Sequence, residues 1–520
     1  MSTARPNLVF VVTDQQRFDA LSSHGGLART PNLDRLAATG ADLRGHFANA
    51  PVCVPSRCSL FTGRYPHAHG VLENDSRLGS HEDHLFAALK ASDYRLGYCG
   101  KNHLLAESEL RGFDYLVTET EDDGSPERRL YRELEQVSLQ RLSDVGSWAS
   151  AAWHDFPYEA TTTGVITDAA LKFLDETKEN DQPYFLTISI SDPHVPHLAP
   201  ARFAGLYPED SIPLPPVPPH GLEGKQPRLK IKQEAQGSLR ATDADRRHYL
   251  AVYSGMCSFI DEQIGRVLDA VARRSDAANT IVVFTSDHGD FCFDHNLCKK
   301  DLVLLDSLLH VPLIISWPGR VKPCIADGTL SEHIDVVPTL LELLGVPMPA
   351  GCQGKSLTPL LFGKTDRHKD EVFAEVCYAG MRNPYSSFEE FLSAWKAARA
   401  DPSHPLHRTA PYNIPGEPTK CIRTREWKYI WSATGIEELY DVARDPLEWH
   451  NIAGRVDCAA TLSQLRTRLG DWHIRTEDPL SPRQKRDLAV RPEWQAAPGS
   501  DGNSTTHSKP LSRSRVPDRS

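Results

Sequence analysis

Side chains that can bind a metal ion follow three apolar runs of the sequence. They are Asp14 after Asn7–Thr13, Asp192 and His194 after Tyr184–Ser191, and Asp287 and His288 after Thr280–Ser286. In open α/β sheets, ligands bind at the carboxyl ends of the strands. An Asp after a strand can also form a turn or cap the next helix. Because three separate runs end in the same way, we expect one shared site in which Asp14, Asp287 and His288 bind a divalent cation.

Residues 51–64 place a potential nucleophile, Cys53, close in sequence to the positively charged side chain of Arg57. Cys53-Val-Pro-Ser-Arg57 is followed by Leu60-Phe-Thr-Gly-Arg64. Ser56–Leu60 is typical of the start of a helix, so we expect Cys53 to lie near the positive end of that helix. A lone cysteine is most often a small buried hydrophobe. The Pro, Ser and Arg at fixed spacing after Cys53 form a pattern that rarely occurs by chance.

The elements that must hold these side chains are buried strands alternating with helices. A fourth apolar run, Val311–Trp317, joins the three above. Such runs are typical of a parallel sheet that is covered on both faces. Thr30 followed by Pro31 predicts a capped helix start, and Arg246–Arg274 reads as a long amphipathic helix. The fold class is therefore α/β, with a large, doubly wound, mostly parallel sheet flanked by helices.

The chain is long enough for two domains. We predict a catalytic domain over 1–350 and a smaller α+β domain over 351–485. The smaller domain would be built on an antiparallel sheet, to which Glu371–Cys377 and Lys420–Trp431 contribute. The proline-rich stretch Tyr207–Pro227 is predicted to be an ordered surface loop. Residues 496–520 are polar and predicted to be disordered.

Composition excludes several classes of function. The net charge of −11 and the lack of a Lys/Arg stripe argue against a nucleic-acid partner. No apolar stretch reaches membrane-spanning length, and the N-terminal apolar run is too short for a signal peptide. We therefore expect a cytoplasmic enzyme without a membrane partner. Its eleven irregularly spaced cysteines would then be mostly reduced thiols.

The segment around Cys53 resembles the signature of the sulfatase family, part of the alkaline-phosphatase-like superfamily. In that family the cysteine of Cys-x-Pro-Ser-Arg is oxidised to formylglycine (3-oxoalanine). The resemblance extends from about Pro6 to Trp472. Further matching segments are Gly100-Lys-Asn-His103, Asp192-Pro-His194, Ser258–Val267, Asp294–Lys300 and Glu438-Leu-Tyr-Asp441.

The resemblance implies a role for each matching residue. Asp14, Asp287 and His288 would hold the cation, with residue 53 as formylglycine and Gln15 completing the shell. Arg57 would stabilise the ionised diol, and Lys101 and Lys300 would neutralise the sulfate oxygens. His194 would protonate the departing alkoxide, and His103 would take the remaining diol proton. The spacing from His295 favours Lys300 over Lys299.

Two departures from the common family pattern affect the metal and the substrate. Many sulfatases have Asp-Asp where this chain has Asp14-Gln15, and Asp-Asn where it has Asp287-His288. Calcium is the metal expected for the family. Because imidazole suits manganese better than calcium, Mn²⁺ is the alternative. Shells of this kind also occur in phosphonate monoester hydrolases and phosphodiesterases. The leading hypothesis is hydrolysis of a sulfate monoester, and the alternative is phosphonate monoester or phosphodiester hydrolysis by the same nucleophile.

The partners follow from this hypothesis. We expect a small-molecule or saccharide sulfate ester as substrate and a formylglycine-generating enzyme for maturation; the chain could also form a homo-oligomer. A catalytically inactive binding protein is disfavoured because the motif residues are all present. Specificity is expected from the loops Leu72–His81, Ser108–Trp153 and Gly380–Asn413. Asn74 and Asn102 are either pocket residues or loop caps.

Overall fold

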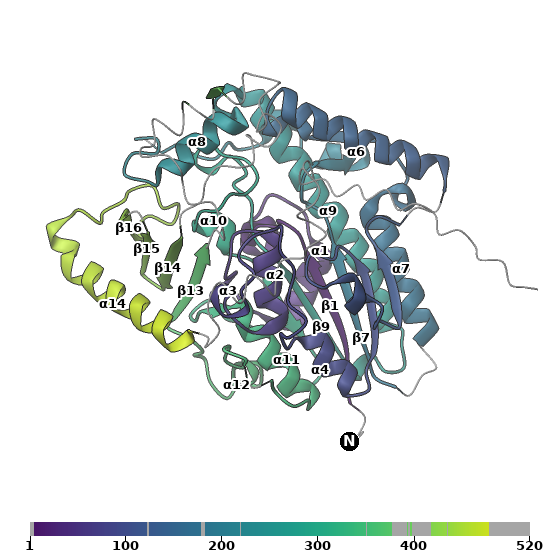
Figure 1. Cartoon of the computed structure of the whole chain (residues 1–520). Coiled ribbons are helices and arrows are strands. Elements are labelled where there is room, and N and C mark those ends of the chain that lie inside the picture. The colour runs from purple at the N-terminus through teal and green to yellow at the C-terminus, as the bar shows by residue number, and fades with distance from the viewer. Residues whose placement is uncertain are drawn as a thin grey trace, which may run out of the picture.

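The structure is a computed structural model that describes residues 5–121, 124–177, 182–218, 220–349, 351–376, 393, 396–397, 418–433 and 435–477. The predicted tail over 496–520 lies outside the described residues, as does nearly all of the loop Gly380–Asn413. A large sheet with helices on both faces forms the centre of the molecule, and a smaller sheet with its own helix lies beside it (Figure 1).

The large sheet has eight strands in the order β11-β2-β10-β9-β1-β7-β4-β5. Their bounds are β1 Asn7–Thr13, β2 Ala41–Asp42, β4 Arg95–Gly100, β5 Tyr115–Thr118, β7 Tyr184–Ile190, β9 Thr280–Ser286, β10 Leu313–Ser316 and β11 Cys324–Ile325. Strand β1 pairs in parallel with both β7 and β9, so their carboxyl ends meet at one edge. This confirms the predicted mostly parallel sheet. The fourth predicted strand, β10, runs antiparallel to β9 and β2 instead.

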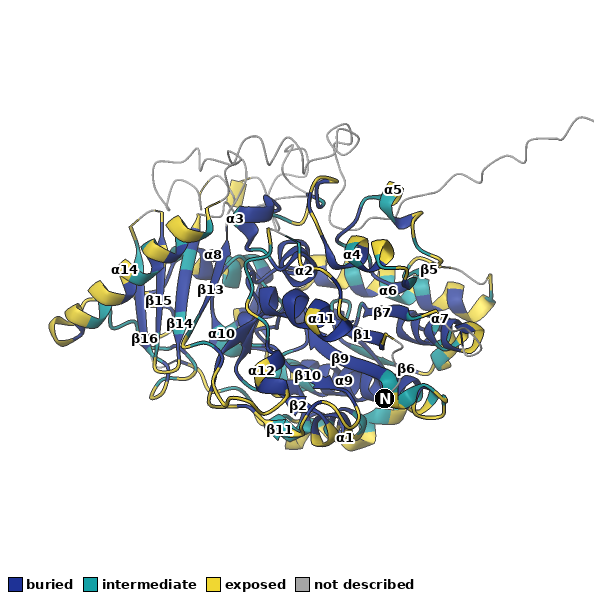
Figure 2. Ribbon diagram, turned by 90° about the horizontal axis from the view of Figure 1, so that it is seen from below, coloured by how far each residue is buried: buried dark blue, intermediate teal, exposed yellow. Residues whose placement is uncertain are grey.

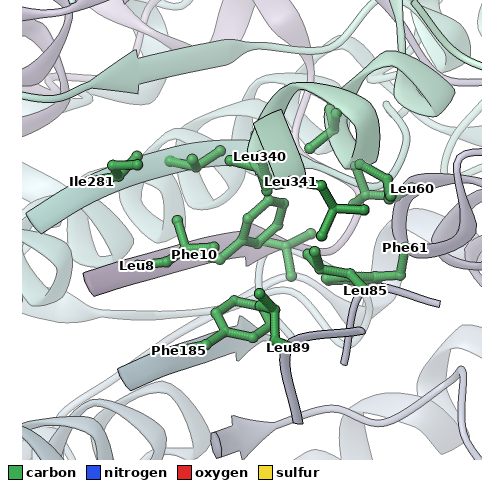
Figure 3. Close-up of a cluster of buried hydrophobic side chains, with 14 of the residues drawn as sticks. Leu8, Phe10, Leu60, Phe61, Leu85, Leu89, Phe185, Ile281, Leu340 and Leu341 are labelled. Atoms are coloured by element: carbon green, nitrogen blue, oxygen red, sulfur yellow. The ribbon is translucent and has the colours of Figure 1, made fainter. Parts of the chain in front are cut away.

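Side chains of β1 alternate between two cores, as the pleat of a strand requires. Leu8 and Phe10 pack against α2 (Cys53–Thr62), α4 (Leu85–Ala91) and α11 (Val336–Leu344), as Figure 3 shows. Fully burying a side chain such as Phe10 stabilises the fold by roughly 1.5–3 kcal/mol.

The opposite face of the sheet carries the second core. Val9 and Val11 of β1 pack there against α1 (Pro31–Thr39), α7 (Thr162–Thr177) and α9 (Asp243–Ala272). The sheet is therefore covered on both faces. The central strands consist mainly of apolar residues because neither of their faces meets water.

Two helix starts differ in detail from the prediction. Thr30 occupies the N-cap of α1, but its side chain makes no capping hydrogen bond. The carboxylate of Asp261 instead accepts hydrogen bonds from the backbone N–H groups of Asn32 and Leu33 at 3.1 and 2.7 Å. Helix α2 begins at Cys53 rather than at Ser56. Pro55 lies in the first turn, where the missing N–H of proline costs no helical hydrogen bond.

The smaller sheet has four antiparallel strands: β13 Glu371–Val376, β14 Thr419–Thr424, β15 Trp427–Ser432 and β16 Glu437–Asp441. The predicted single segment Lys420–Trp431 is thus a hairpin of β14 and β15. Helix α14 (Ala459–Thr476) covers the sheet with Leu465, Leu469 and Trp472. Figure 2 shows that the strands of both sheets are mostly buried, while α14 exposes its outer side.

The remaining elements are short connections and peripheral helices. They are β3 His46–Phe47, β6 Ala152–His154, β8 Leu198–Pro200, β12 Ser331–Glu332, α3 Pro66–His69, α5 Glu107–Leu110, α6 Pro126–Asp144, α8 Pro227–Gln236, α10 Asp306–Leu309 and α12 Thr358–Leu361. Within the described part of the chain, no helix is both long and apolar enough to cross a membrane. The ten cysteines in the described residues are free thiols.

Candidate active site

Four potential ligand atoms converge at the carboxyl edge of the large sheet. Asp14 follows β1, Asp287 and His288 follow β9, and Cys53 is the first residue of α2. One ligand atom from each of these residues lies within 4.8 Å of the others, and all four residues are buried. The parallel pairing of β1 and β9 puts their ends side by side, and α2 brings Cys53 to the same point.

The ring of His288 is fixed by its own loop. Its Nδ1 lies 2.9 Å from the carbonyl oxygen of Gly289, to which it donates a hydrogen bond. Its Nε2 therefore faces the cluster, 3.4 Å from the Cys53 sulfur and 3.6 Å from oxygens of both Asp14 and Asp287. Burial and Lys300 oppose charge on this ring, but Asp287 and Cys53 together outweigh them and raise the pKa of His288. A neutral His288 would offer Nε2 as a metal ligand.

Three cations balance the two buried carboxylates. Arg57 donates to Asp287 from Nε at 2.8 Å and lies 3.4 Å from Asp14 through Nη2. The Nζ of Lys101 lies 2.8 Å from Asp14, and that of Lys300 lies 3.7 Å from it. Burial alone would raise the pKa of Asp14, but these cations hold it well below its usual value. Asp14 is thus kept in the form that binds cations.

Cys53 lies at the centre of this charge distribution. The Nζ of Lys300 is 2.9 Å from its sulfur. Burial and Asp14 raise the pKa of Cys53. Lys300, Lys101 and His288 lower it by a larger amount in total, so that the net shift of this pKa is downward. The next backbone N–H, of Val54, donates to the side-chain oxygen of Asn74 at 3.0 Å. Asn74 therefore caps α2 next to residue 53.

The other signature residues build the helix that carries Cys53. Ser56 donates to the carbonyl oxygen of Asp287 at 2.5 Å, which ties α2 to the end of β9. Gly63 ends α2 with a φ of 70°, a left-handed conformation that residues with a side chain rarely adopt. A Cβ at this position would also lie 2.6 Å from the sulfur of Cys352. The glycine in the Thr-Gly-Arg part of the motif is thus explained by helix termination.

The two predicted proton-transfer histidines have different surroundings. Nδ1 of His194 lies 2.8 Å from the carbonyl oxygen of Val195, which leaves Nε2 free of that bond. Nδ1 of His103 is buried and has no hydrogen-bond partner among the described residues. Burial lowers the pKa of both rings, with added repulsion from Lys300 and Lys101 at His194 and from Lys101 at His103.

The structure separates the residues that the sequence left ambiguous. Lys300 reaches Cys53, whereas burial and Lys232 lower the pKa of Lys299 to about 7 in a neighbouring environment. Asn102 is a loop cap, because its side chain bonds the backbone of Leu104 and Leu105. The side-chain oxygen of Gln15 accepts a hydrogen bond from Lys300 at 3.1 Å.

Three further residues contact the site although no motif singled them out. Ser189, within β7, accepts a hydrogen bond from Arg57 at 2.7 Å. Nε2 of His333 donates to the carbonyl oxygen of Asp287 at 3.1 Å. Asp290, three residues after Asp287, binds the side chain of Gln15. The position of Asp290 after β9 was the one available signal, because Ser189 and His333 reach the site through tertiary structure.

Comparisons with known proteins identify the family of this chain and agree with its fold. A family model described as Sulfatase matches residues 6–346. An uncharacterized sulfatase of Escherichia coli (strain K12) is 26% identical over 515 residues, which cover 95% of this chain and 93% of the relative. An arylsulfatase of Clostridium perfringens is 26% identical over 489 residues, covering 89% of this chain and 93% of the relative.

A solved structure gives the same fold. A phosphonate monoester hydrolase from Silicibacter pomeroyi superposes with a TM-score of 0.73 at 22% identity, covering 91% of this chain and 96% of that chain. The match of the family model extends over well over half of the 520 residues. The chain therefore belongs to the sulfatase family and is a sulfuric ester hydrolase.

Proposed function

We propose that this sulfatase hydrolyses a sulfate monoester to an alcohol and inorganic sulfate, using formylglycine made from Cys53 and a divalent cation. The supporting observation is that the ligand atoms of Asp14, Cys53, Asp287 and His288 lie within 4.8 Å of one another. Lys101 and Lys300 contribute two further positive charges beside Asp14 and Cys53. An anionic ester at residue 53 would thus meet positive charge.

The donor set fits a divalent cation. Two carboxylates and the imidazole Nε2 of His288 are suitable ligands, and the cluster is closed to solvent. Gln15 would add a carbonyl oxygen. Calcium is the first candidate, and manganese is the alternative because of His288. When present, formylglycine would supply the attacking hydroxyl as its hydrate, and the cation would lower the pKa of that hydroxyl.

The remaining residues orient the ester and move protons. Lys101 and Lys300 would bind the sulfate oxygens and stabilise the charge that moves onto them. Arg57 would hold Asp14 and Asp287 in place through its hydrogen bond and ion pair with them. His194 would protonate the oxygen of the departing alcohol, and His103, which is neutral by virtue of its lowered pKa, would accept a proton at residue 53.

The proposal includes two partners. One is a sulfate ester of a small molecule or a saccharide. The other is a formylglycine-generating enzyme, because the resemblance to sulfatases implies that a separate maturation enzyme oxidises Cys53.

One experiment tests the nucleophile. The protein is co-expressed with a formylglycine-generating enzyme, and the peptide that contains residue 53 is analysed by mass spectrometry. We expect loss of the thiol and gain of an aldehyde and its hydrate. Cys53→Ala, which has no thiol to convert, is the control for both the mass shift and activity. An unmodified Cys53 in the presence of an active maturation enzyme would overturn the proposal.

A second candidate, phosphonate monoester hydrolysis, is favoured by one observation. The imidazole of His288 is part of the donor set, and the structural similarity to a phosphonate monoester hydrolase shows that this fold accommodates that reaction. We therefore compare kcat/KM for an aryl sulfate with that for phenyl phosphonate on the converted protein. We expect the sulfate to be preferred; a large preference for the phosphonate would replace the leading proposal.

A further inference from the structure

The side-chain amide of Gln15 lies between one acceptor and one donor. Its nitrogen donates to the carboxylate of Asp290, and its oxygen accepts from the ammonium of Lys300 at 3.1 Å. A carboxylate can accept but not donate, and an ammonium can donate but not accept. The orientation of this amide is therefore determined by its neighbours: the nitrogen faces Asp290 and the oxygen faces Lys300.

Asp290 is itself held rigidly. It is completely buried, and one of its oxygens accepts a hydrogen bond from the backbone N–H of Cys292 at 2.6 Å. Its other oxygen accepts from Gln15, and the hydroxyl of Tyr249 lies 3.4 and 3.5 Å from the two oxygens. That hydroxyl is in turn 3.2 Å from Nε2 of His197. Both carboxylate oxygens thus already have an N–H donor.

The backbone of Gln15 is fixed at the same point. Its φ is 72°, which is costly for a residue with a side chain. Its N–H donates to Asp287 at 3.0 Å, and its carbonyl oxygen accepts from the hydroxyl of Tyr253 at 3.0 Å. The chain therefore maintains a strained conformation that directs the Gln15 side chain between Asp290 and the cluster.

We propose that Asp290 is a positioning residue that orients the amide of Gln15, so that its oxygen rather than its nitrogen faces the cation site and Lys300. This inference rests on the proposed divalent-cation site. Where many sulfatases have a second carboxylate, Gln15 offers a neutral oxygen, and a neutral amide can present either of its two atoms to the site. Lys300 attracts the oxygen from inside the site, and Asp290 holds the nitrogen from outside it.

The isosteric variant Asp290→Asn tests directly whether Asp290 orients the amide of Gln15. Asparagine has one side-chain oxygen, and the N–H of Cys292 needs an acceptor. The new amide nitrogen then faces Gln15, whose own amide must turn and present its nitrogen to the site. We expect the Kd for Mn²⁺ or Ca²⁺, measured by isothermal titration calorimetry, to rise by about 10- to 100-fold, the usual effect of losing a partner that orients a ligand.

The double variant Gln15→Glu with Asp290→Asn is the matched rescue. The amide introduced at position 290 would donate to one oxygen of the carboxylate introduced at position 15. The second oxygen of that carboxylate would face Lys300, with the same net charge as the original pair. We expect a Kd within about fivefold of the original protein. Gln15→Glu alone places two buried carboxylates together, so we expect a lower Tm of the metal-free protein.

The outcomes are distinguishable. If the original protein binds Mn²⁺ or Ca²⁺ and Asp290→Asn binds it equally well, while only the Tm of the metal-free protein falls, Asp290 is a structural residue and the inference is wrong. If the original protein binds neither ion, both the cation site and the inference fail. If Asp290→Asn does not fold, the double variant tests the inference instead. A Kd for the ion near that of the original protein would support a positioning role for Asp290. A Kd as weak as that of Gln15→Ala would overturn this role.

Discussion

The Nζ of Lys300 lies 2.9 Å from the sulfur of Cys53, a contact between residues 247 positions apart. The same ammonium lies 3.1 Å from the side-chain oxygen of Gln15 and 3.7 Å from Asp14. It thus joins the nucleophile position to the predicted metal ligands. Lys299, its neighbour, has a φ of 61° and a pKa lowered to about 7, first by burial and then by Lys232.

Lys300→Met should lower kcat/KM for an aryl sulfate by about 100- to 1,000-fold, which is typical for the loss of one preorganised donor to a developing charge. Lys299→Met is the matched control and should change kcat/KM by less than about tenfold. Steady-state kinetics on fully converted protein measures both. Equal losses in the two variants would contradict the assignment of Lys300.

Arg57→Met should destabilise the metal-free protein by about 3–5 kcal/mol, because it removes the guanidinium that pairs with buried Asp287 and leaves Asp14 with one cation fewer. Arg57 donates to Asp287 and lies beside Asp14, and it is almost completely buried. Urea unfolding in the presence of a chelator measures the loss. Adding Mn²⁺ should recover part of it, because the ion replaces the missing positive charge.

Arg64→Met is the control for this prediction. Arg64 belongs to the same signature segment but pairs with Glu82 at 2.6 Å, outside the cluster. Its loss of stability should therefore be the same with and without Mn²⁺. Recovery of Arg64→Met by the ion, or no recovery of Arg57→Met, would count against a cation site between Asp14 and Asp287.

Much of the fold could be predicted because its central strands are continuous apolar runs. The predicted bounds of β1 and β9 agree with the structure, and both strands lead directly into predicted ligands. The direction of β10 relative to its neighbours could not be predicted, because a strand that is covered on both faces is a continuous apolar run in either direction. The β14–β15 hairpin was missed because its connection, Arg425-Glu426, lacks the Gly or Asn that marks most tight turns.

The candidate site was predictable where a local motif exists. The segments around Cys53, Lys101, His194 and Lys300 each carry a recognisable pattern, and the structure brings Cys53, Lys101 and Lys300 to Asp14. Ser189 and His333 carry no such pattern. Each touches the site through pairing or packing with a distant segment, and so the sequence alone gives no reason to select them.

His194→Ala should reduce kcat/KM more for an ester with a poor leaving group than for one with a good leaving group. If His194 protonates the departing oxygen, kcat/KM for an alkyl sulfate should fall by about 100- to 10,000-fold. The value for 4-nitrophenyl sulfate should fall much less, because its leaving oxygen needs little protonation. A plot of log kcat/KM against leaving-group pKa should therefore become steeper. His103→Ala is the comparison, and equal losses for both esters in His194→Ala would exclude the acid role.

Acid stability should depend on His310, which is stacked on Phe18 and Phe47 with ring centroids 3.9 and 4.7 Å away. Burial lowers the pKa of His310 to about 4; Arg423 adds to this effect, while the carbonyl of Arg44 and the carboxylates of Asp306 and Asp19 oppose it. The ordinary pKa is 6.5, so the unfolded chain binds a proton below that pH and the native state does not. The contribution to stability is therefore present above pH 6.5 and lost as the pH falls toward 4.

His310→Phe keeps the stacking but cannot bind a proton. It should lower the free energy of unfolding at pH 7 by about 0.5–1.5 kcal/mol, because the hydrogen bond to the carbonyl of Arg44 is lost. The decrease in stability between pH 7 and pH 5 should, however, be about 2 kcal/mol smaller than in the original protein, at about 1.36 kcal/mol per pH unit below pH 6.5. Urea unfolding at pH 7, 6 and 5 measures this difference. An unchanged slope with pH would show that His310 binds its proton equally well in the folded and unfolded states.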